Sequence, residues 1–247
     1  MQWRSRIDQA IDSGSLIFHC QPIFKLGSLN PALFEVLVRL VEPSGEVIPA
    51  ARFVHDVTAE QWKAIDRLAV LGTLAHLKNN PIPHAVNISG HTLNDLQFPG
   101  WLTKQLEESS LSPHLLLIEV SEEAQIFVGS IAMYAVTAIR SLAIQVGLDD
   151  FTIGFANIPS LMVLKPEFLK VDGSTVRLIG GQDADTVRQS ITYMAMAYCF
   201  HEKIPVILEF VENGEILMQI QKMAKDFPRL EVFVQGHFEL FGEARPC

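Results

Sequence analysis

The chain has 247 residues, of which 49% are hydrophobic and 19% are charged, and this composition suits one large globular domain. Asp and Glu number 28 against 19 Lys and Arg, so the net charge of −9 argues against broad, nonspecific binding to nucleic acid polymers or anionic membranes. The first residues are polar, and every apolar run is well short of the roughly 18 residues that indicate a membrane span. We therefore expect no membrane insertion by this chain.

The cysteines and histidines give no strong signal of a metal site. Cys20, Cys199 and Cys247 are far apart and form no CxxC pair, which is typical of a protein in a reducing cytoplasm. We therefore expect free thiols and a cytoplasmic protein. His84 and His91 lack a metal-ligand spacing such as HExxH, and we expect a strand-edge and a surface histidine rather than ligands.

Strand-like and helix-like segments alternate along the chain, which is the pattern of a parallel α/β fold. Strands are predicted at Leu16–Ile23, Leu33–Arg39, His84–Ser89, Leu115–Ser121, Gln145–Phe151, Phe168–Asp172, Pro205–Val211 and Glu231–Gln235. Helices are predicted at Glu60–Lys78, Trp101–Ser109, Ser130–Leu142, Asp183–Phe200 and Asn213–Asp226. Residues 27–31 are too few for a crossover helix, so the first two strands should be antiparallel. The sequence predicts one (β/α)8 TIM-type barrel over residues 1–247.

Seven of the strand-like runs carry a charged or amide side chain near the C-terminal end. These residues are Glu35, Asn87, Glu119, Asp149 with Asp150, Lys170, Glu209 and Gln235. Burial of a charge is costly unless the charge is paired or binds a metal, so seven such cases favour a shared site over an accident of packing. Active sites of (β/α)8 barrels lie at the C-terminal strand ends, where these side chains could converge.

The donor types indicate one or two hard cations, Mg²⁺ or Mn²⁺, which prefer the oxygens offered by Glu35, Asn87, Glu119 and Asp149. A second site sharing Asp149 could be completed by Asp150 and Glu209. Paired metal ions with a bridging water are a recurrent device for phosphodiester hydrolysis. Lys170 lies in an apolar run, where neighbouring anions or a developing oxyanion best explain a cation, and a purely structural ion pair is the alternative.

Eight short motifs occur in a fixed order along the chain. They are Gln21–Ile23 (QPI), Phe34–Arg39 (FEVLVR), Val86–Ser89 (VNIS), Ile118–Glu122 (IEVSE), Asp149–Phe151 (DDF), Lys170–Asp172 (KVD), Glu209–Glu212 (EFVE) and Gln235–Gly236 (QG). Over nearly the whole chain this ordered set resembles an EAL-type cyclic di-GMP phosphodiesterase domain, with EVL where the family reads EAL.

The resemblance implies that one metal ion is held by Glu35, Asn87, Glu119 and Asp149, and a second by Asp149, Asp150 and Glu209. It also implies that cyclic di-GMP contacts Gln21 and Arg39, with Arg39 on a phosphate, and we add Gln235 to the substrate-binding set. Catalytic roles are expected for Glu35, Lys170 and Glu209, and loop-positioning roles for Glu122 and Glu212. In such a family the chain would serve bacterial second-messenger signalling, as a homodimer or beside a sensory or signalling domain.

The loop after the fifth predicted strand departs most from the family. The family's DDFGTGYSS is DDFTIGFAN at residues 149–157, so Thr152 replaces a glycine and Ile153 a small polar residue. Both changes stiffen the backbone. In the family this loop positions metal and contributes to the dimer. A further departure is Phe210, which stands beside Glu209 where a small residue is usual and could displace that ligand by overpacking.

Three functions remain open from the sequence. The favoured one is metal-dependent hydrolysis of cyclic di-GMP to linear pGpG, because every candidate ligand is present and an obsolete cluster of carboxylates would cost stability. The second is an EAL domain that binds cyclic di-GMP as a receptor or interaction module without efficient turnover. The third is a glycosidase-like barrel with paired carboxylates, which would not require an Asn, an Asp-Asp pair and a Lys in this arrangement.

Overall fold

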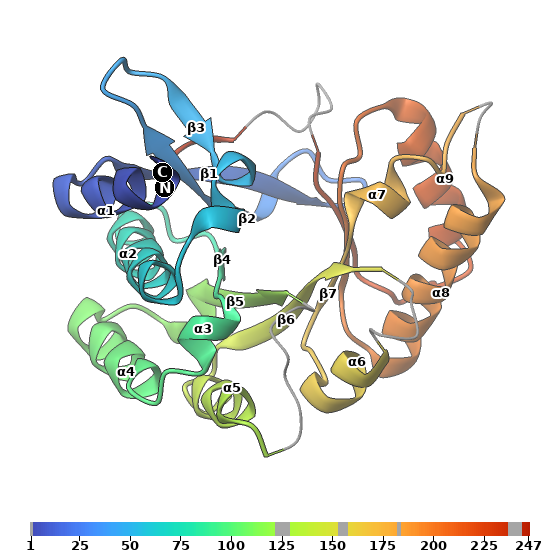
Figure 1. Ribbon diagram of the computed structural model, residues 1–247. Coiled ribbons are helices and arrows are strands. Elements are labelled where there is room, and N and C mark those ends of the chain that lie inside the picture. Colours follow the sequence, from blue (N-terminus) through green and yellow to red (C-terminus); the bar gives the residue numbers. More distant parts are fainter. Residues whose placement is uncertain (1, 122–128, 153–157, 182–183, 237–243) are drawn as a thin grey trace.

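The computed structural model describes residues 2–121, 129–152, 158–181, 184–236 and 244–247. Its strands form a closed barrel with helices packed around the outside (Figure 1). The barrel strands are β1 (Leu16–Lys25), β2 (Pro31–Val41), β4 (His84–Asn87), β5 (Leu116–Ser121), β6 (Gln145–Phe151), β7 (Leu169–Val171), β8 (Val206–Leu208) and β9 (Val232–Val234).

The longer outer helices are α2 (Ala59–Leu77), α4 (Phe98–Ser109), α5 (Ile131–Ser141), α8 (Thr186–Glu202) and α9 (Gly214–Ala224). The remaining elements are helices α1 (Gln2–Ser13), α3 (Gly90–Leu93), α6 (Ile158–Leu164) and α7 (Gly173–Val176), 3-10 turns η1 (Ala50–Arg52), η2 (Val54–Asp56) and η3 (Pro113–Leu115), and short strands β3 (Val47–Pro49) and β10 (Arg245–Pro246). Among the described residues, no helix combines the length and apolarity needed to cross a bilayer.

The barrel is closed by β1, which pairs antiparallel with β2 on one side and with β9 on the other. The other neighbouring barrel strands pair in parallel. The predicted (β/α)8 TIM-type barrel with an antiparallel first pair is therefore confirmed. The sequence analysis missed β3 and β10, because segments of two or three residues carry no periodic pattern, and it missed α1, whose buried stripe around Ile7 and Ala10 is narrow.

Inward-facing side chains form two layers inside the barrel. The lower layer is apolar and contains Ile23, Leu33, Ala85, Leu117, Phe168, Ile207 and Phe233. Two positions closer to the mouth, the same strands carry Gln21, Glu35, Asn87, Glu119, Lys170, Glu209 and Gln235. Residues two apart on a strand share one face, so each apolar residue and its polar counterpart both point inward. The apolar layer is thus a floor beneath a polar ring.

At residue 147 the floor has a glycine, which makes room for an aromatic ring. A Cβ atom on Gly147 would lie only 2.2 Å from Cε2 of Phe168, so the ring occupies the space that a side chain on β6 would take. Asp149 follows two residues later and joins the polar ring.

Helix α2 covers the outside of β2 and β4 and forms one wall of the barrel mouth. It begins with a capping box, in which Thr58 accepts a hydrogen bond from the Gln61 amide and the Gln61 side chain accepts one from the Thr58 amide. Its buried face includes Val70 and Leu74, which belong to the core between barrel and helices. This packing fixes the position of Asp66, which faces the mouth.

The expectation of free thiols is wrong for two of the three cysteines. Cys20 on β1 and Cys247 form a disulfide with a Cα–Cα distance of 5.3 Å, although 227 positions separate them. Strand β10 pairs antiparallel with β1, with Arg245 opposite Cys20, and this pairing brings Cys247 alongside. The spacing of the cysteines in the sequence gives no indication of this strand pairing. Cys199 is a free, buried cysteine as expected.

Candidate active site

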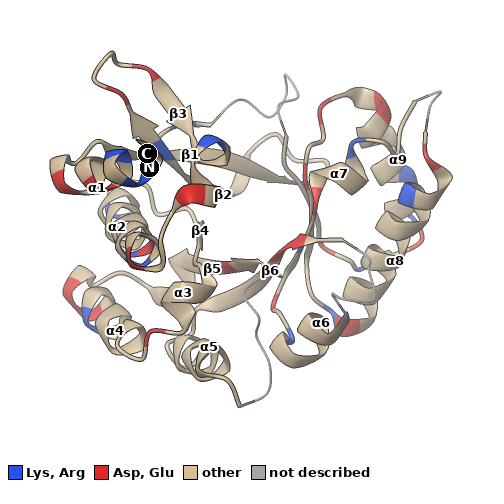
Figure 2. Ribbon diagram, viewed as in Figure 1, with Lys and Arg blue, Asp and Glu red and all other residues tan. Residues whose placement is uncertain are grey.

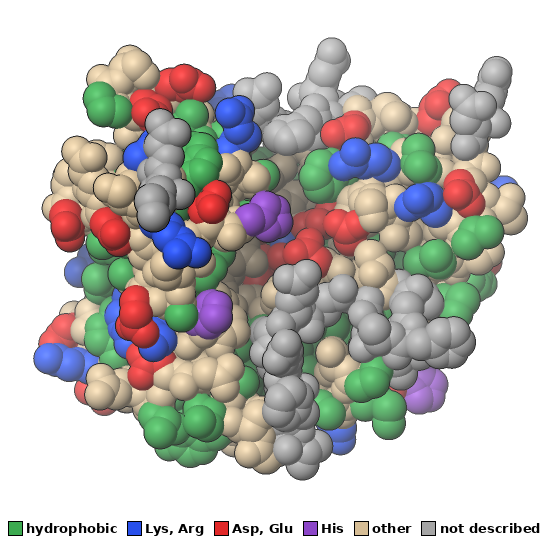
Figure 3. All heavy atoms as spheres, in the orientation of Figure 1, with side chains coloured by type: hydrophobic (Ala, Val, Ile, Leu, Met, Phe, Trp, Pro, Cys, Tyr) green, Lys and Arg blue, Asp and Glu red, His purple; other side chains and the backbone are tan. Residues whose placement is uncertain are grey.

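A cavity of about 970 Å³ opens at the C-terminal ends of the parallel strands. Acidic positions lie along β5 and β6 (Figure 2), and the space-filling view shows acidic side chains gathered in the hollow at the centre of this face (Figure 3). The cavity is lined by residues of the polar ring, including Glu35, Asn87, Glu209 and Gln235. The structure therefore brings the predicted site residues of seven strands to one mouth.

Lys170 stands at the centre of the polar ring. Its Nζ lies 2.9 Å from Glu119 Oε2, 2.9 Å from Glu209 Oε1, 3.0 Å from Asp149 Oδ1 and 3.3 Å from Glu35 Oε2. Burial alone would lower the pKa of this lysine, but the four carboxylates outweigh it and raise the pKa well above its usual range. One ammonium therefore joins acids from β2, β5, β6 and the end of β8.

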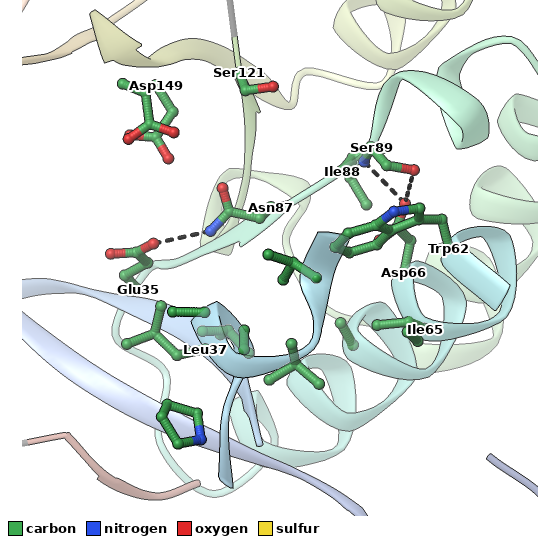
Figure 4. A pocket seen from close by; sticks show the side chains of 18 of the residues that line it. Glu35, Leu37, Trp62, Ile65, Asp66, Asn87, Ile88, Ser89, Ser121 and Asp149 are labelled. Carbon is green, nitrogen blue, oxygen red and sulfur yellow. Dashed lines mark hydrogen bonds between the residues drawn. The ribbon is translucent and has the colours of Figure 1, made fainter. Parts of the chain in front are cut away.

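Glu35 is the best-satisfied acid of the ring. Asn87 Nδ2 donates to its Oε1 at 2.8 Å, and Gln235 Nε2 donates to its Oε2 at 2.5 Å. Figure 4 shows Asn87 turned with its amide nitrogen toward Glu35. Burial opposes ionisation of Glu35, but Lys170 and these two amide donors together lower its pKa. Glu35 is thus held as a carboxylate.

A bulge in β6 directs the side chains of two consecutive aspartates toward the barrel mouth. Neighbouring residues of a regular strand point to opposite faces, yet between its pairs with Leu169 and Val171 of β7, β6 advances three residues, from Leu148 to Phe151. Asp150 takes a left-handed backbone conformation with φ of 56° at this point. The extra residue and this turn place the carboxylates of Asp149 and Asp150 on one side.

Two groups of three carboxylates have oxygen atoms close enough to share an ion. The oxygens of Glu35, Glu119 and Asp149 lie within 4.8 Å of one another, and so do those of Asp149, Asp150 and Glu209. Within the described part of the chain, the buried Oε1 of Glu119 has no hydrogen-bond partner. An all-oxygen donor set with an unused buried acceptor fits Mg²⁺ or Mn²⁺. Metal binding by these residues stays a prediction.

The acids outnumber the ammonium, and this raises several of their pKa values. Burial raises the pKa of Glu209 to about 8, with Lys170 opposing the shift. The Asp150 residue is exposed at the rim, but partial desolvation of its carboxyl and the neighbouring Asp149 raise its pKa to about 7. Burial also raises the pKa of Asp149 and raises that of Glu119 well above its usual range, again against Lys170.

Arg39 and Gln21 lie where an anionic ligand would approach. Gln21 sits opposite Glu35 in the β1–β2 pair, and both Gln21 and Arg39 line the cavity. Among the described residues that line it, Arg39 is the only Lys or Arg. Its Nη1 donates to the Val38 carbonyl at 2.9 Å. A guanidinium has five N–H donors, so this bond leaves donors for a phosphate.

Sequence reasoning missed Asp66 and Trp62 on α2, which line the cavity on the side away from Glu35 and Asp149 (Figure 4). Asp66 Oδ2 accepts hydrogen bonds from the Ser89 amide at 2.9 Å and the Ser89 hydroxyl at 2.7 Å. Burial raises the pKa of Asp66 to about 6, while these donors oppose the shift. The helical spacing could have indicated Asp66. It is a charged residue on the same face of the helix as apolar residues one turn away, such as Val70, which are buried.

Phe210 occupies a conformation that favours glycine. It follows Glu209 with φ of 53°. Its ring covers Gly173, where an added Cβ would lie 1.9 Å from the Phe210 ring, and the Arg177 guanidinium lies 4.6 Å from the ring centroid. Gly173 makes room for the ring, and Glu209 Oε1 lies 2.9 Å from Lys170 Nζ. Displacement of Glu209 as a metal ligand stays a prediction.

Of the two acids that were predicted to position loops, the structure describes only one. Glu122 lies outside the described residues, as does Ile153 of the divergent loop. Glu212 is described and is exposed beyond the end of β8. Its loop-positioning role stays a prediction.

Together, the fold and the site define a TIM-type barrel whose C-terminal mouth is suited to divalent ions and an anionic ligand. The family model described as "EAL domain" matches residues 4–228, and the chain therefore belongs to the EAL domain family.

Named relatives carry the same domain. The chain is 28% identical over 235 residues to "Cyclic di-GMP phosphodiesterase PdeB" of Shewanella oneidensis, covering 92% of this chain and 27% of that protein. It is 26% identical to "Cyclic di-GMP phosphodiesterase PdeF" of Escherichia coli, covering 98% of this chain and 32% of that protein. The chain thus spans about a third or less of the length of these curated relatives.

A solved structure supports the same assignment. The FimX EAL domain from Pseudomonas aeruginosa bound to c-di-GMP is 25% identical to this chain, with a TM-score of 0.82 over 95% of this chain and 93% of that one.

The raised carboxyl pKa values predict that the metal-free protein loses stability as pH rises from 6 to 8. In this range the folded protein retains protons on Glu209 and Asp150, with pKa values of about 8 and about 7, that the unfolded chain has already released. Denaturant midpoints in a chelator at both pH values measure the effect. Glu209→Gln should flatten the dependence, whereas the exposed neighbour Glu212→Gln should not. A midpoint that rises with pH would contradict the assignment.

Replacing Lys170 should destabilise the fold strongly. Lys170→Met leaves four carboxylates without their shared cation, and removing one partner of a buried ion pair costs about 3–5 kcal/mol. Urea unfolding at pH 7 measures the loss. The control is Lys25→Met, because Lys25 pairs with Glu231 at the surface and such pairs contribute at most about 1 kcal/mol. Equal losses in the two variants would show that Lys170 is not the centre of the ring.

Proposed function

We propose that this domain hydrolyses cyclic di-GMP to linear pGpG. The observation that carries the proposal is the pair of carboxylate triads that share Asp149 around Lys170, at the mouth of an EAL-family barrel. Cyclic di-GMP is a cyclic phosphodiester, and opening it requires a water to attack one phosphorus while a ribose oxygen leaves. An oxygen-only cluster of acids suits that reaction because it can hold the cations that balance phosphate charge.

Some of these residues would bind the ions, and others hold the ion-binding side chains in position. Glu35, Asn87, Glu119 and Asp149 would hold one ion, and Asp149, Asp150 and Glu209 a second. When bound, Mg²⁺ or Mn²⁺ supplies Lewis-acid activation of the phosphodiester and of the attacking water. Lys170 keeps the acids of four strands in register and stabilises negative charge that develops close to them. Asn87 and Gln235 fix the orientation of Glu35.

Ligand recognition would depend on Arg39. It is the positive side chain on the wall of a cavity that is otherwise strongly acidic, and a guanidinium binds a phosphate with two parallel hydrogen bonds. Gln21 on β1, opposite Glu35, and Gln235 just after β9, which donates to Glu35, add amide groups. PdeB and PdeF, which are named as cyclic di-GMP phosphodiesterases, support this choice of substrate.

A receptor without efficient turnover is the second candidate, and the backbone at Phe210 favours it. A non-glycine residue with φ of 53° immediately follows a ligand of the second triad, and Thr152 stiffens the other side of the site. In-line attack tolerates little misplacement of the second triad, whereas ligand binding can persist with the strand-borne residues alone. The two functions therefore differ in the segments that follow β6 and β8.

The setting is proposed on the same basis. The chain spans only part of the length of its curated relatives, so we propose that the barrel works beside a sensory or signalling domain, in the cytoplasm of a bacterium. A homodimer through the loop after β6 is a further proposal from the family.

Cyclic di-GMP should bind the purified domain, and Arg39→Ala should weaken binding by at least about tenfold, because a charge-assisted hydrogen bond contributes about 1.5–3 kcal/mol. Titration calorimetry with Ca²⁺ in place of Mg²⁺ measures binding while suppressing turnover. The matched control is Arg229→Ala, since Arg229 is exposed and outside the cavity. An absence of heat at high ligand concentration would sink both candidate functions.

Turnover decides between the two candidates. Wild-type protein with Mn²⁺ and cyclic di-GMP should yield pGpG on chromatography, and Glu35→Ala should abolish the product. If the protein binds cyclic di-GMP but forms no pGpG, it is a receptor and not a phosphodiesterase. Two variants then locate the defect: Phe210→Gly relieves the left-handed residue beside Glu209, and Thr152→Gly with Ile153→Thr restores the family loop. A large gain in product from one of them assigns the loss to that segment.

A further inference from the structure

A second cluster of metal-type side chains lies outside the barrel mouth, between the barrel wall and α2. Cys20 on β1, His76 near the end of α2 and His84 at the start of β4 each place one donor atom within 4.8 Å of the others. His84 is the first residue of β4, whereas Asn87, the last, faces the mouth. Cys20 and His84 alternate with the inward-facing Gln21 and Ala85, so the cluster lies on the outer side of the barrel wall from the acidic site.

The imidazole of His84 has the burial, the tautomer and the free nitrogen that suit a metal ligand. It was expected at a strand edge, but its side chain is completely buried. Its Nδ1 lies 2.7 Å from the Ile82 carbonyl, which can only accept, so Nδ1 carries the proton and Nε2 has the free lone pair. Among the described residues that buried Nε2 has no hydrogen-bond partner. A backbone carbonyl on the other nitrogen is how proteins orient metal-binding histidines.

The surroundings hold both rings in place and keep His84 neutral. Phe34 stacks on His84 with ring centroids 5.1 Å apart, and His76 meets the same ring edge-on at 5.1 Å. Asn80 Nδ2 donates to His76 Nε2 at 3.2 Å, and turning the Asn80 amide over would instead place its oxygen there to accept from Nε2–H and leave Nδ1 of His76 free for a metal. Burial lowers the pKa of His84, so the ring is uncharged at neutral pH.

A second cysteine lies beside the cluster. Cys247 is bonded to Cys20, so its sulfur lies next to that of Cys20, and Cys247 itself is exposed and follows the two-residue strand β10. In a reducing compartment the bond would open to two thiols beside two imidazoles. That is the donor set of structural zinc sites, which are tetrahedral and built from Cys and His.

We propose that in the reduced protein Cys20, Cys247, His76 and His84 bind one zinc ion, and that the Cys20–Cys247 disulfide is the metal-free alternative. Zinc–ligand bonds of about 2.0–2.3 Å set donor separations of about 3.3–3.8 Å, so donor atoms that lie within 4.8 Å of one another must approach by at most about 1.5 Å. The exposed Cys247 and the end of α2 are the parts that can move. Thiolate and imidazole select zinc over the Mg²⁺ or Mn²⁺ of the all-oxygen mouth.

Conversion of the disulfide form to the zinc form requires a two-electron reductant, and a dithiol can supply the electrons. The dithiol loses two electrons and becomes a disulfide, while the Cys20–Cys247 bond accepts them and, with two protons, becomes two thiols. Zinc binding then releases those two protons as the thiolates form. In either state a covalent or coordinate link fastens the segment after β10 to β1, and the zinc form also ties in α2 and β4.

Cobalt spectroscopy tests the proposal on a chain that carries no polyhistidine tag. After reduction by a phosphine, one equivalent of Co²⁺ should give thiolate-to-cobalt charge-transfer absorption and intense tetrahedral d–d bands, and Zn²⁺ should erase both. The oxidised protein should give neither. The described residues that line the acidic mouth include no sulfur donor and would give no charge-transfer signal, so failure here is separable from failure of the proposed function.

The variants assign the ligands. Cys20→Ser should abolish the defined site, Cys247→Ser should roughly halve the charge-transfer intensity, and His76→Ala and His84→Gln should each weaken Zn²⁺ affinity at least tenfold. The exposed His114→Ala is the matched control and should change nothing. If His84→Gln does not fold, His76→Ala on the half-buried end of α2 decides the histidine side.

A second readout follows the thiols. Zn²⁺ should protect two thiols of the reduced wild type from a thiol reagent and raise its melting temperature, with no effect on the oxidised form. No charge-transfer band in the reduced wild type, a band unchanged in Cys20→Ser or Cys247→Ser, or Zn²⁺ affinity unchanged in His76→Ala would each overturn the proposed site.

Discussion

The buried ammonium of Lys170 is the interaction on which the rest of the site depends. Four carboxylates from four strands converge on one nitrogen at 2.9–3.3 Å, above an apolar floor that excludes water. Acids brought this close would repel one another without a shared cation. Lys170 meets this constraint only in part, because one charge cannot balance four carboxyl groups, and burial together with this imbalance raises the pKa values of Glu119, Asp149 and Glu209. A divalent cation would supply the positive charge that lets these acids ionise.

Two non-glycine residues in left-handed backbone frame the second triad. Asp150 sits in the β6 bulge and Phe210 directly follows Glu209, so both irregular positions adjoin residues expected to hold an ion. Such conformations persist only where the surrounding structure enforces them. The Phe210 ring packs on Gly173, and the Arg177 guanidinium lies over the ring. The choice between enzyme and receptor thus depends on backbone geometry rather than on missing ligands.

The barrel wall separates two groups of candidate metal-binding side chains. Inside its mouth the donors are oxygens, whereas the cluster between β1, β4 and α2 offers sulfur and imidazole nitrogen. Strand alternation produces this separation, because Glu35 and Asn87 point into the barrel while Cys20 and Val36 belong to the core outside it. The oxygen donors of the mouth would suit a hard ion, and the sulfur and nitrogen donors of the wall would suit zinc.

The sequence by itself determined the barrel, its antiparallel first pair and the ring of polar residues, because period-two alternation and strand-end position are local properties of the chain. It did not determine the β6 bulge, the packing of the Phe210 ring on Gly173, the inclusion of Asp66 in the cavity or the Cys20–Cys247 bond. Each of these depends on how segments far apart in sequence meet in register. Only closure of the barrel, which brings β10 to β1 and α2 to β4, decides such contacts.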